Sequence, residues 1–239
     1  MTYAPPVVGR SIDDAFRAYR AHWRYLLTIS FAVCVPVGTL AVWLESAGAT
    51  SMATGLVASI ATSAMLALLA APVSELHAGR PLPSPAGVLA PLRGRTGALG
   101  AVTLVLAAVN LAGTLAYGIP LLVAAVWLAF VVPAVVLDRR RSEGAFRRSF
   151  SLVRGHAWPI FGLVLVNAAL FAAVVVPLLL AAHALDTRLR WTGSWLIALF
   201  VTSPFIAMSF LFTFLRLREE KDAEPAAVRG EGATIERPA

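Results

Sequence analysis

The histidines and carboxylates are the first residues to examine for chemistry, because metal-assisted hydrolysis needs such groups clustered around an ion. The histidines of the chain are His22, His77, His156 and His183. They lack the paired spacing of metal ligands, and the sequence contains no GxSxG, P-loop or dinucleotide-binding motif. The sequence therefore predicts a protein that is not an enzyme and that holds neither a metal ion nor a cofactor.

Two asparagines, Asn110 and Asn167, are the notable polar residues inside long apolar stretches. Amides in a bilayer commonly join neighbouring helices, at about 1 kcal/mol each. The alternative is that they line a path for a polar solute. We favour helix joining, because no full charge accompanies these amides and pumps usually place one at the membrane midplane.

The arginines form the third group of residues that could bind a ligand. The net charge is +7, and Lys221 is the only lysine among 20 basic residues. The arginines adjoin apolar segments instead of forming one basic domain, so we expect anionic lipid headgroups on the cytoplasmic side as partners, and no nucleic acid. The sequence identifies no protein partner. The residues expected at headgroups or at the membrane interface are Arg17, Arg20, Arg139, Arg140, Arg147, Arg148, Arg154, Trp23 and Trp158.

Composition places these residues in a membrane protein. The 239 residues are 59% hydrophobic and 14% charged, whereas a soluble domain carries about 25% charged residues. Apolar runs of about 20 residues can cross the hydrocarbon core. The sequence predicts an all-α protein with six spans, at residues 25–44, 55–76, 98–117, 119–137, 157–182 and 192–215. Prolines that would kink these spans are Pro36, Pro72, Pro133, Pro177 and Pro204.

Amphipathic helices that lie in the membrane plane are predicted before the first and fifth spans. The first falls within residues 1–24, where Ile12, Phe16 and Tyr19 share one face. The second covers residues 142–155, with Phe146 and Phe150 on its apolar side and Gly155 as its stop. Residues 216–239 mix charges with proline and glycine, which predicts a disordered cytoplasmic tail.

Basic residues predict the orientation of the spans. The N-terminal segment carries four, the second loop three, the fourth loop six and the C-terminal tail five, whereas the opposite side carries only Arg188 and Arg190. Because Lys and Arg favour the cytoplasmic side, we expect a multi-pass protein of the cell membrane with both termini in the cytoplasm.

A short internal similarity accompanies the two in-plane helices. The tetrapeptides at residues 14–17 and 144–147 are Asp-Ala-Phe-Arg and Gly-Ala-Phe-Arg, and each precedes a span. Residues 84–92 precede the third span and could be a degraded copy. The pattern predicts three repeated units, each with one in-plane helix and one membrane hairpin. Chance is the alternative, because the similarity is short.

Residues 127–171 resemble the membrane domain associated with glycerophosphoryl diester phosphodiesterases, and also related uncharacterised bacterial six-span proteins. The resemblance is carried by the apolar run 130–137, the acid Asp138, the segments 145–150 and 152–155, Trp158, and residues 161–162. It implies a six-span architecture. It does not imply phosphodiesterase activity, because we expect no room in 239 residues for the catalytic domain that some members carry.

The functional prediction is a non-enzymatic scaffold or accessory protein of the membrane, and the resemblance points to envelope or lipid homeostasis. One alternative is a small transporter or channel-like protein with a polar path near Asn110 and Asn167. Another is a membrane enzyme that acts on lipid headgroups at the arginine-rich face. A polar cavity at the midplane would favour the transporter, whereas a sealed interior would favour the scaffold.

Overall fold

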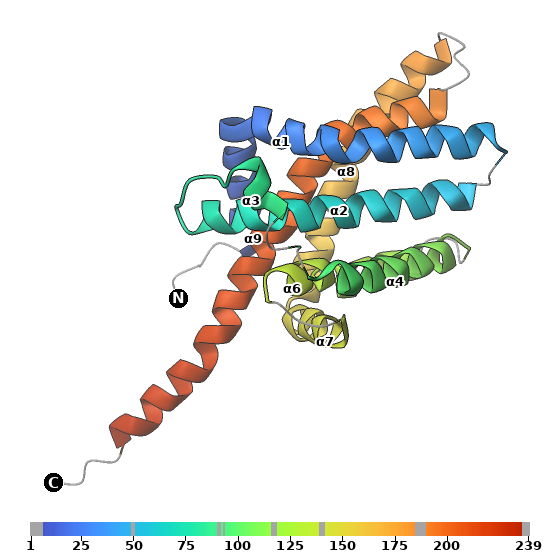
Figure 1. The fold of residues 1–239 in the computed structure, drawn as a ribbon. Helices are drawn as coiled ribbons and strands as arrows, with labels where there is room; N and C mark the ends of the chain where they lie inside the picture. Colours follow the sequence, from blue (N-terminus) through green and yellow to red (C-terminus); the bar gives the residue numbers. More distant parts are fainter. Residues whose placement is uncertain are drawn as a thin grey trace.

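The computed structural model describes residues 7–48, 51–89, 92, 94–115, 119–138, 142–184 and 190–235. Throughout these residues the chain forms helices and turns, with no strand (Figure 1). The helices are α1 (Val7–Ser46), α2 (Ser51–His77), α3 (Pro85–Leu89), α4 (Thr96–Leu115), α5 (Ile119–Leu128), α6 (Val131–Val136), α7 (Ser142–Val153), α8 (Ala157–Ala184) and α9 (Arg190–Ile235). The predicted all-helical class is confirmed for this part of the chain.

Within the described residues, four helices contain stretches long and apolar enough to cross a membrane, namely α1, α2, α8 and α9. Shorter apolar stretches occur at Thr96–Asn110 in α4 and at Val123–Val136 in α5 and α6. Large apolar side chains such as Phe31, Leu104 and Leu180 point outward and are exposed. An apolar exterior of this kind suits hydrocarbon as the surrounding solvent.

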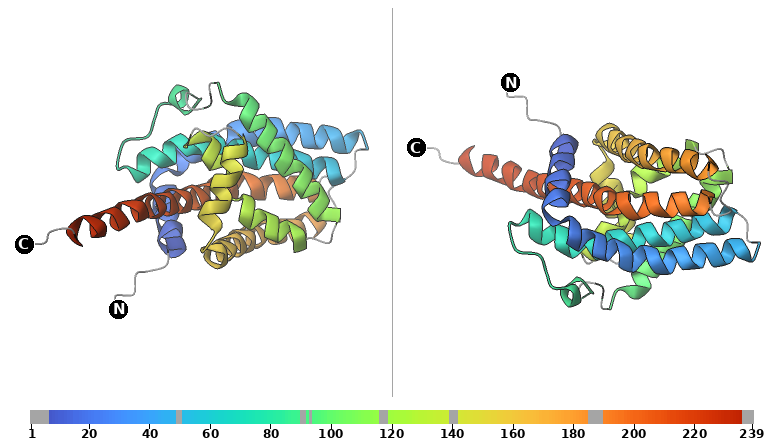
Figure 2. Two further views of the ribbon diagram at one scale, coloured as in Figure 1. Left: turned by 90° about the horizontal axis from the view of Figure 1, so that it is seen from below. Right: turned by 90° about the horizontal axis from the view of Figure 1, so that it is seen from above.

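The helix α1 combines the predicted in-plane helix with the predicted first span. Its backbone leaves the helical region at His22, where φ is −125° and ψ is 25°. Figure 2 shows that the part before this kink lies across the long helices, as α7 also does, at the end from which the C-terminus projects. The predicted in-plane helix and span are therefore joined by a kink within α1.

The predicted fourth span, residues 119–137, is two helices instead of one. Phe130 lies between α5 and α6 with φ −106° and ψ 7°. Pro133 explains the break, because a proline ring clashes with the carbonyl four residues earlier, here that of Ala129. Within α6 the same proline occupies the first turn, where no amide hydrogen is missed, and the Ala134 amide donates to the Phe130 carbonyl at 3.0 Å.

The helix α9 continues to Ile235, so the structure differs from the disorder predicted from residue 216 onward. Leu217 is buried, and Arg216, Arg218 and Asp222 form ion pairs with other elements. These contacts hold the turns that follow the apolar part of α9, and Arg, Glu, Lys and Ala are good helix formers. Figure 1 shows the last turns of α9 extending away from the other helices.

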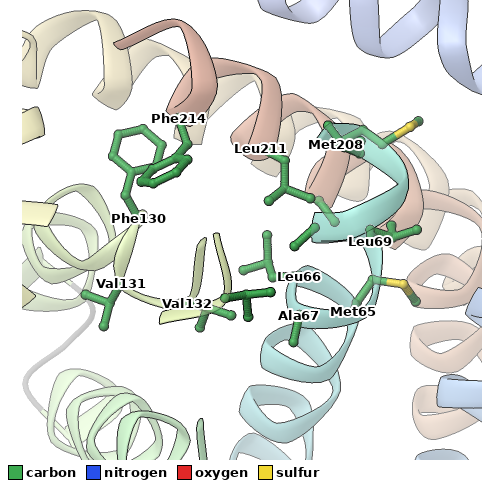
Figure 3. Close-up of a cluster of buried hydrophobic side chains, with 14 of the residues drawn as sticks. Met65, Leu66, Ala67, Leu69, Phe130, Val131, Val132, Met208, Leu211 and Phe214 are labelled. Atoms are coloured by element: carbon green, nitrogen blue, oxygen red, sulfur yellow. The ribbon is translucent and has the colours of Figure 1, made fainter. Parts of the chain in front are cut away.

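One part of the buried core lies where α2, α6 and α9 meet (Figure 3). Leu69 from α2, the Phe130 side chain, and Met208 and Phe214 from α9 are completely buried there. The rings of Phe130 and Phe214 lie 5.9 Å apart. Phe130, which lies at the break between α5 and α6, thus has its aromatic side chain buried among these helices.

Candidate functional site

A cavity of about 400 Å³ is lined by Val132 of the short helix α6 and, for the most part, by residues of five longer helices. These helices form a ring in which each contacts the next, in the order α2, α4, α5, α8, α9 and back to α2. The helix α1 supplies no residue to the lining that the structure describes. The polar residues of the lining are Ser59, Thr62, Ser63, Asn110, Asn167 and Ser203, and its other described residues are apolar.

Both predicted asparagines line this cavity, and each also joins two helices of the ring. The Asn110 amide nitrogen donates to the Ser59 hydroxyl at 2.5 Å, which connects α4 to α2. Asn167 is only 4% exposed. Its amide nitrogen donates to the Ser209 hydroxyl at 3.0 Å, which connects α8 to α9, and to the Leu163 carbonyl at 3.0 Å. The structure therefore brings the two amides to one cavity, which the sequence alone does not predict.

The two amides lie at different positions along their helices. Asn110 is residue 15 of the 20 in α4, whereas Asn167 is residue 11 of the 28 in α8. Both helices follow the end of the bundle that holds α3 and α7 (Figure 1). Asn110 therefore lies further along its helix than Asn167 does.

The hydroxyl groups of α2 were missed by the sequence analysis. Ser59, Thr62 and Ser63 occupy positions i, i+3 and i+4, which places them on one face of the helix. Their spacing within an apolar segment was the sequence signal that could have identified them. It would have predicted a polar stripe on α2 but not the helices that face it.

A charged collar, which we define as Asp14, Asp138, Arg148, Arg216, Arg218 and Asp222, lies at one end of the ring. Asp138 pairs with Arg148 at 3.1 Å and with Arg218 at 3.3 Å, and Asp222 pairs with Arg148 at 2.9 Å. Arg216 pairs with Asp14. Three of the six collar residues come from α9, so this helix connects the first part of α1, the segment after α6, and α7.

Arg148 is placed differently from the prediction that it contacts lipid headgroups. Its side chain is 18% exposed and that of Asp138 is 10% exposed. Burial lowers the pKa of Arg148, but hydrogen bonds and charges from Asp222 and Asp138 outweigh burial and leave the pKa above its ordinary value. Arg148 therefore stays charged and serves as an internal ion-pair partner.

The other predicted interface residues that the structure describes lie at the surface. Arg20, Arg147 and Arg154 are exposed. Arg17 is exposed and pairs with Asp14 at 2.5 Å. The Trp158 side chain is 82% exposed, and Trp23 is exposed with the Arg24 guanidinium 5.6 Å from its ring centre. Arg139 and Arg140 lie outside the described residues.

The prolines differ in what they do to the backbone. Pro36, Pro72, Pro177 and Pro204 lie inside α1, α2, α8 and α9. The helices α2 and α8 continue through Pro72 and Pro177, and the kink of α1 lies at His22 and not at Pro36. Pro133 is the predicted kink residue that coincides with a helix break in the described chain.

The face of α7 that packs against the other helices consists mainly of small and aliphatic residues. Ala145, Ser149, Leu152 and Val153 are buried, whereas Phe150 is exposed and stacks on Trp127 with ring centres 5.3 Å apart. The small residues allow α7 to approach α5 and α6 closely, and the Ser149 hydroxyl donates to the Trp127 carbonyl at 2.7 Å. The helix ends where expected, since Gly155 has φ of +94°.

The histidines take part in separate contacts. His77 lies 2.9 Å from Glu219, and His156 lies 3.8 Å from Glu220. Within the described residues, no group of three or more His, Cys, Asp and Glu side chains is arranged to hold a metal ion.

These features define an all-helical protein with several helices that are long and apolar enough to span a membrane. The chain belongs to a family described as a domain of unknown function (DUF7847), whose family model matches residues 81–217. The match covers α3 to α8 and α9 as far as Leu217. No curated protein and no solved structure matches the chain.

Proposed function

We propose that the protein is a non-enzymatic integral membrane scaffold or accessory protein. The observation that carries this proposal is the use of both intramembrane amides to join helices, Asn110 to Ser59 and Asn167 to Ser209. Hydrogen bonds of this kind fix helices relative to one another, as a scaffold requires. A role in envelope or lipid homeostasis is supported by the resemblance to the membrane domain associated with glycerophosphoryl diester phosphodiesterases.

The proposal includes six spans in the cell membrane, with both termini in the cytoplasm. The 20 residues of α4 extend about 30 Å at 1.5 Å per residue, enough to cross the hydrocarbon core. We treat α5 and α6 as one broken span. The asymmetry of basic residues supports cytoplasmic termini. Three repeated units are supported by Ala15 and Ala145, which are both fully buried at matching positions.

Reporter fusions test this topology. Fusions after Ala49, Gly118 and Ala184 should report the outside, because these sites follow the first, third and fifth spans. Fusions after Gly87, Gly144 and Ala223 should report the cytoplasm. A fusion after Gly144 that reports the outside would contradict the six-span arrangement.

The scaffold role is tested by replacing both amides with leucine. Each replacement should lower stability by about 1 kcal/mol, because one interhelical hydrogen bond is lost. The double variant should keep activity wherever it stays folded. The measurements are complementation of a deletion strain and thermal unfolding of the purified variants in detergent. A stable but inactive double variant would overturn the scaffold role.

A small transporter or channel-like protein is the second candidate. It is favoured by the cavity, which both amides line and which contains hydroxyl groups from α2 and α9. We place it second because the described lining is mostly apolar and carries no charged residue with which to bind a driving ion.

A further inference from the structure

We propose that the cavity among α2, α4, α5, α8 and α9 binds a neutral single-chain amphiphile, such as an alkyl or isoprenoid alcohol. The chain would lie against the apolar wall, and its hydroxyl would meet the polar stripe of α2. This inference goes beyond the scaffold role, because it gives the bundle a ligand of a defined chemical class.

The absence of charged side chains from the described lining of the cavity argues against a ligand with an ionic head. An ionised phosphate, carboxylate or ammonium inside would lose its hydration without gaining an opposite charge, which is strongly unfavourable. The arginines Arg148, Arg216 and Arg218 are not among the described lining residues, and they pair with the acids of the charged collar. The bound molecule is therefore neutral.

The volume of the cavity limits the size of the ligand. A cavity of about 400 Å³ holds on the order of 13 water-sized groups at about 30 Å³ each. This corresponds to one chain of about a dozen carbons with a small head, and not to a lipid with two acyl chains. The cavity is partly open, so a longer chain could extend from it into the surrounding hydrocarbon.

The distribution of polar groups explains why the ligand is an amphiphile and not an alkane. Met65, Leu106, Phe171 and Phe210 contribute apolar surface from four different helices. Thr62 faces the same space, its side chain is exposed, and a hydroxyl can both donate and accept a hydrogen bond. One alcohol group could exchange hydrogen bonds with the hydroxyl groups of α2, whereas an alkane could make no polar contact with them.

Photolabelling of the full chain in lipid nanodiscs tests the inference. The probes are a dodecanol and a dodecanoic acid that carry the same diazirine, used at pH 9 so that the acid is ionised. Mass spectrometry of the digested protein should locate the alcohol in peptides that contain Thr62, Asn110 or Ala168. Excess unlabelled dodecanol should remove this labelling, and the acid should label the same peptides about tenfold less, because its charge has no partner in the cavity.

Two alanines of α8 provide a matched pair of variants. Ala168 lines the cavity, whereas its neighbour Ala169 is exposed and is not among the lining residues. The change Ala168→Phe should abolish cavity labelling because the new ring fills the space, and Ala169→Phe should leave it unchanged. Thermal unfolding confirms that each variant is folded, and Ala125→Leu on α5 serves as a second cavity-filling variant if Ala168→Phe does not fold.

Several results would overturn the inference. Equal labelling of the cavity peptides by acid and alcohol would refute a neutral ligand. Labelling confined to outward residues such as Leu104 and Leu180 would refute the site, as would alcohol labelling that persists in the folded cavity-filling variants. A stable but inactive amide double variant overturns the scaffold role instead, so the two proposals fail in distinguishable ways.

Discussion

The first part of α1, residues 7–21, and α7 were both predicted to lie in the membrane plane, and they share the sequence Ala-Phe-Arg but dock differently. In both, the alanine (Ala15 or Ala145) is completely buried and the arginine (Arg17 or Arg147) is exposed. The first helix bends at His22 and continues into the rest of α1, whereas α7 ends before Gly155 and a separate helix follows. The shared residues thus set which face is buried, and the residues that follow set the connection.

The two helices share a short sequence, but the ion pairs that hold them differ. Asp14 on the first helix pairs with one residue of α9, Arg216. Arg148 on α7 belongs to a four-membered set with Asp138, Arg218 and Asp222. Both helices are held by neighbouring turns of α9, but α7 is held by more interactions. The comparison predicts that α7 is the more sensitive of the two to loss of charge.

Replacing the collar acid that pairs with α7 and, separately, the collar acid on the first part of α1 should give the largest difference in stability between the two helices. We expect Asp138→Asn to lower the free energy of unfolding by about 2–3 kcal/mol, since the largely buried Arg148 and the more exposed Arg218 both lose an acid. Asp14→Asn should lower it by about 1.5 kcal/mol, because Asp14 has one partner on α9. Chemical unfolding in a mild detergent measures both, with the exposed Glu143→Gln as a control. Equal losses would show that the four-membered set adds nothing to α7.

Enlarging the shared alanine should have a smaller but similar effect on both helices. Ala15→Leu and Ala145→Leu each add three carbons to a fully buried position, and overpacking of this kind costs about 1–3 kcal/mol. The same unfolding assay applies, and Ala169→Leu on the exposed surface of α8 is the control. If only one variant is destabilised, the two alanines do not occupy equivalent positions and the proposed repeat loses its main support.

Truncating the shared arginine should have the smallest effect. Arg17→Ala and Arg147→Ala should each change the free energy of unfolding in detergent by less than about 0.5 kcal/mol, because both side chains are exposed. Binding of each variant to vesicles with anionic lipids measures the headgroup contact expected of these arginines. A large loss of stability from either change would place that arginine in the docked interface.

Local signals in the sequence predicted much of the fold. The apolar runs correspond to the long helices, and α7 begins at Ser142 and is followed by Gly155 as expected. The break before α6 was foreseeable from Pro133, because the clash of its ring with the fourth preceding carbonyl is a local effect. The kink at His22 has no comparable local cause in the sequence.

The site was less predictable, because it depends on contacts between distant parts of the chain. Asn110 and Asn167 were identified as polar groups in apolar segments, but their meeting at one cavity requires the closed ring of five helices. The continuation of α9 beyond residue 216 depends on Asp14 and Asp138, which lie 202 and 80 residues before their partners Arg216 and Arg218. The composition of the C-terminal segment does not predict these ion pairs, because their partners lie far away in the sequence.

The position of α9 in the fold has a consequence for biosynthesis. Of the described helices it is translated last, yet α1, α2, α7 and α8 all contact it. Until α9 enters the membrane, Asn167 lacks Ser209 and Asp14 lacks Arg216. A chain without this helix would therefore keep only contacts within one helix for these two residues, Asn167 with Leu163 and Asp14 with Arg17, and would lack the links that join α8 and α1 to the rest of the bundle.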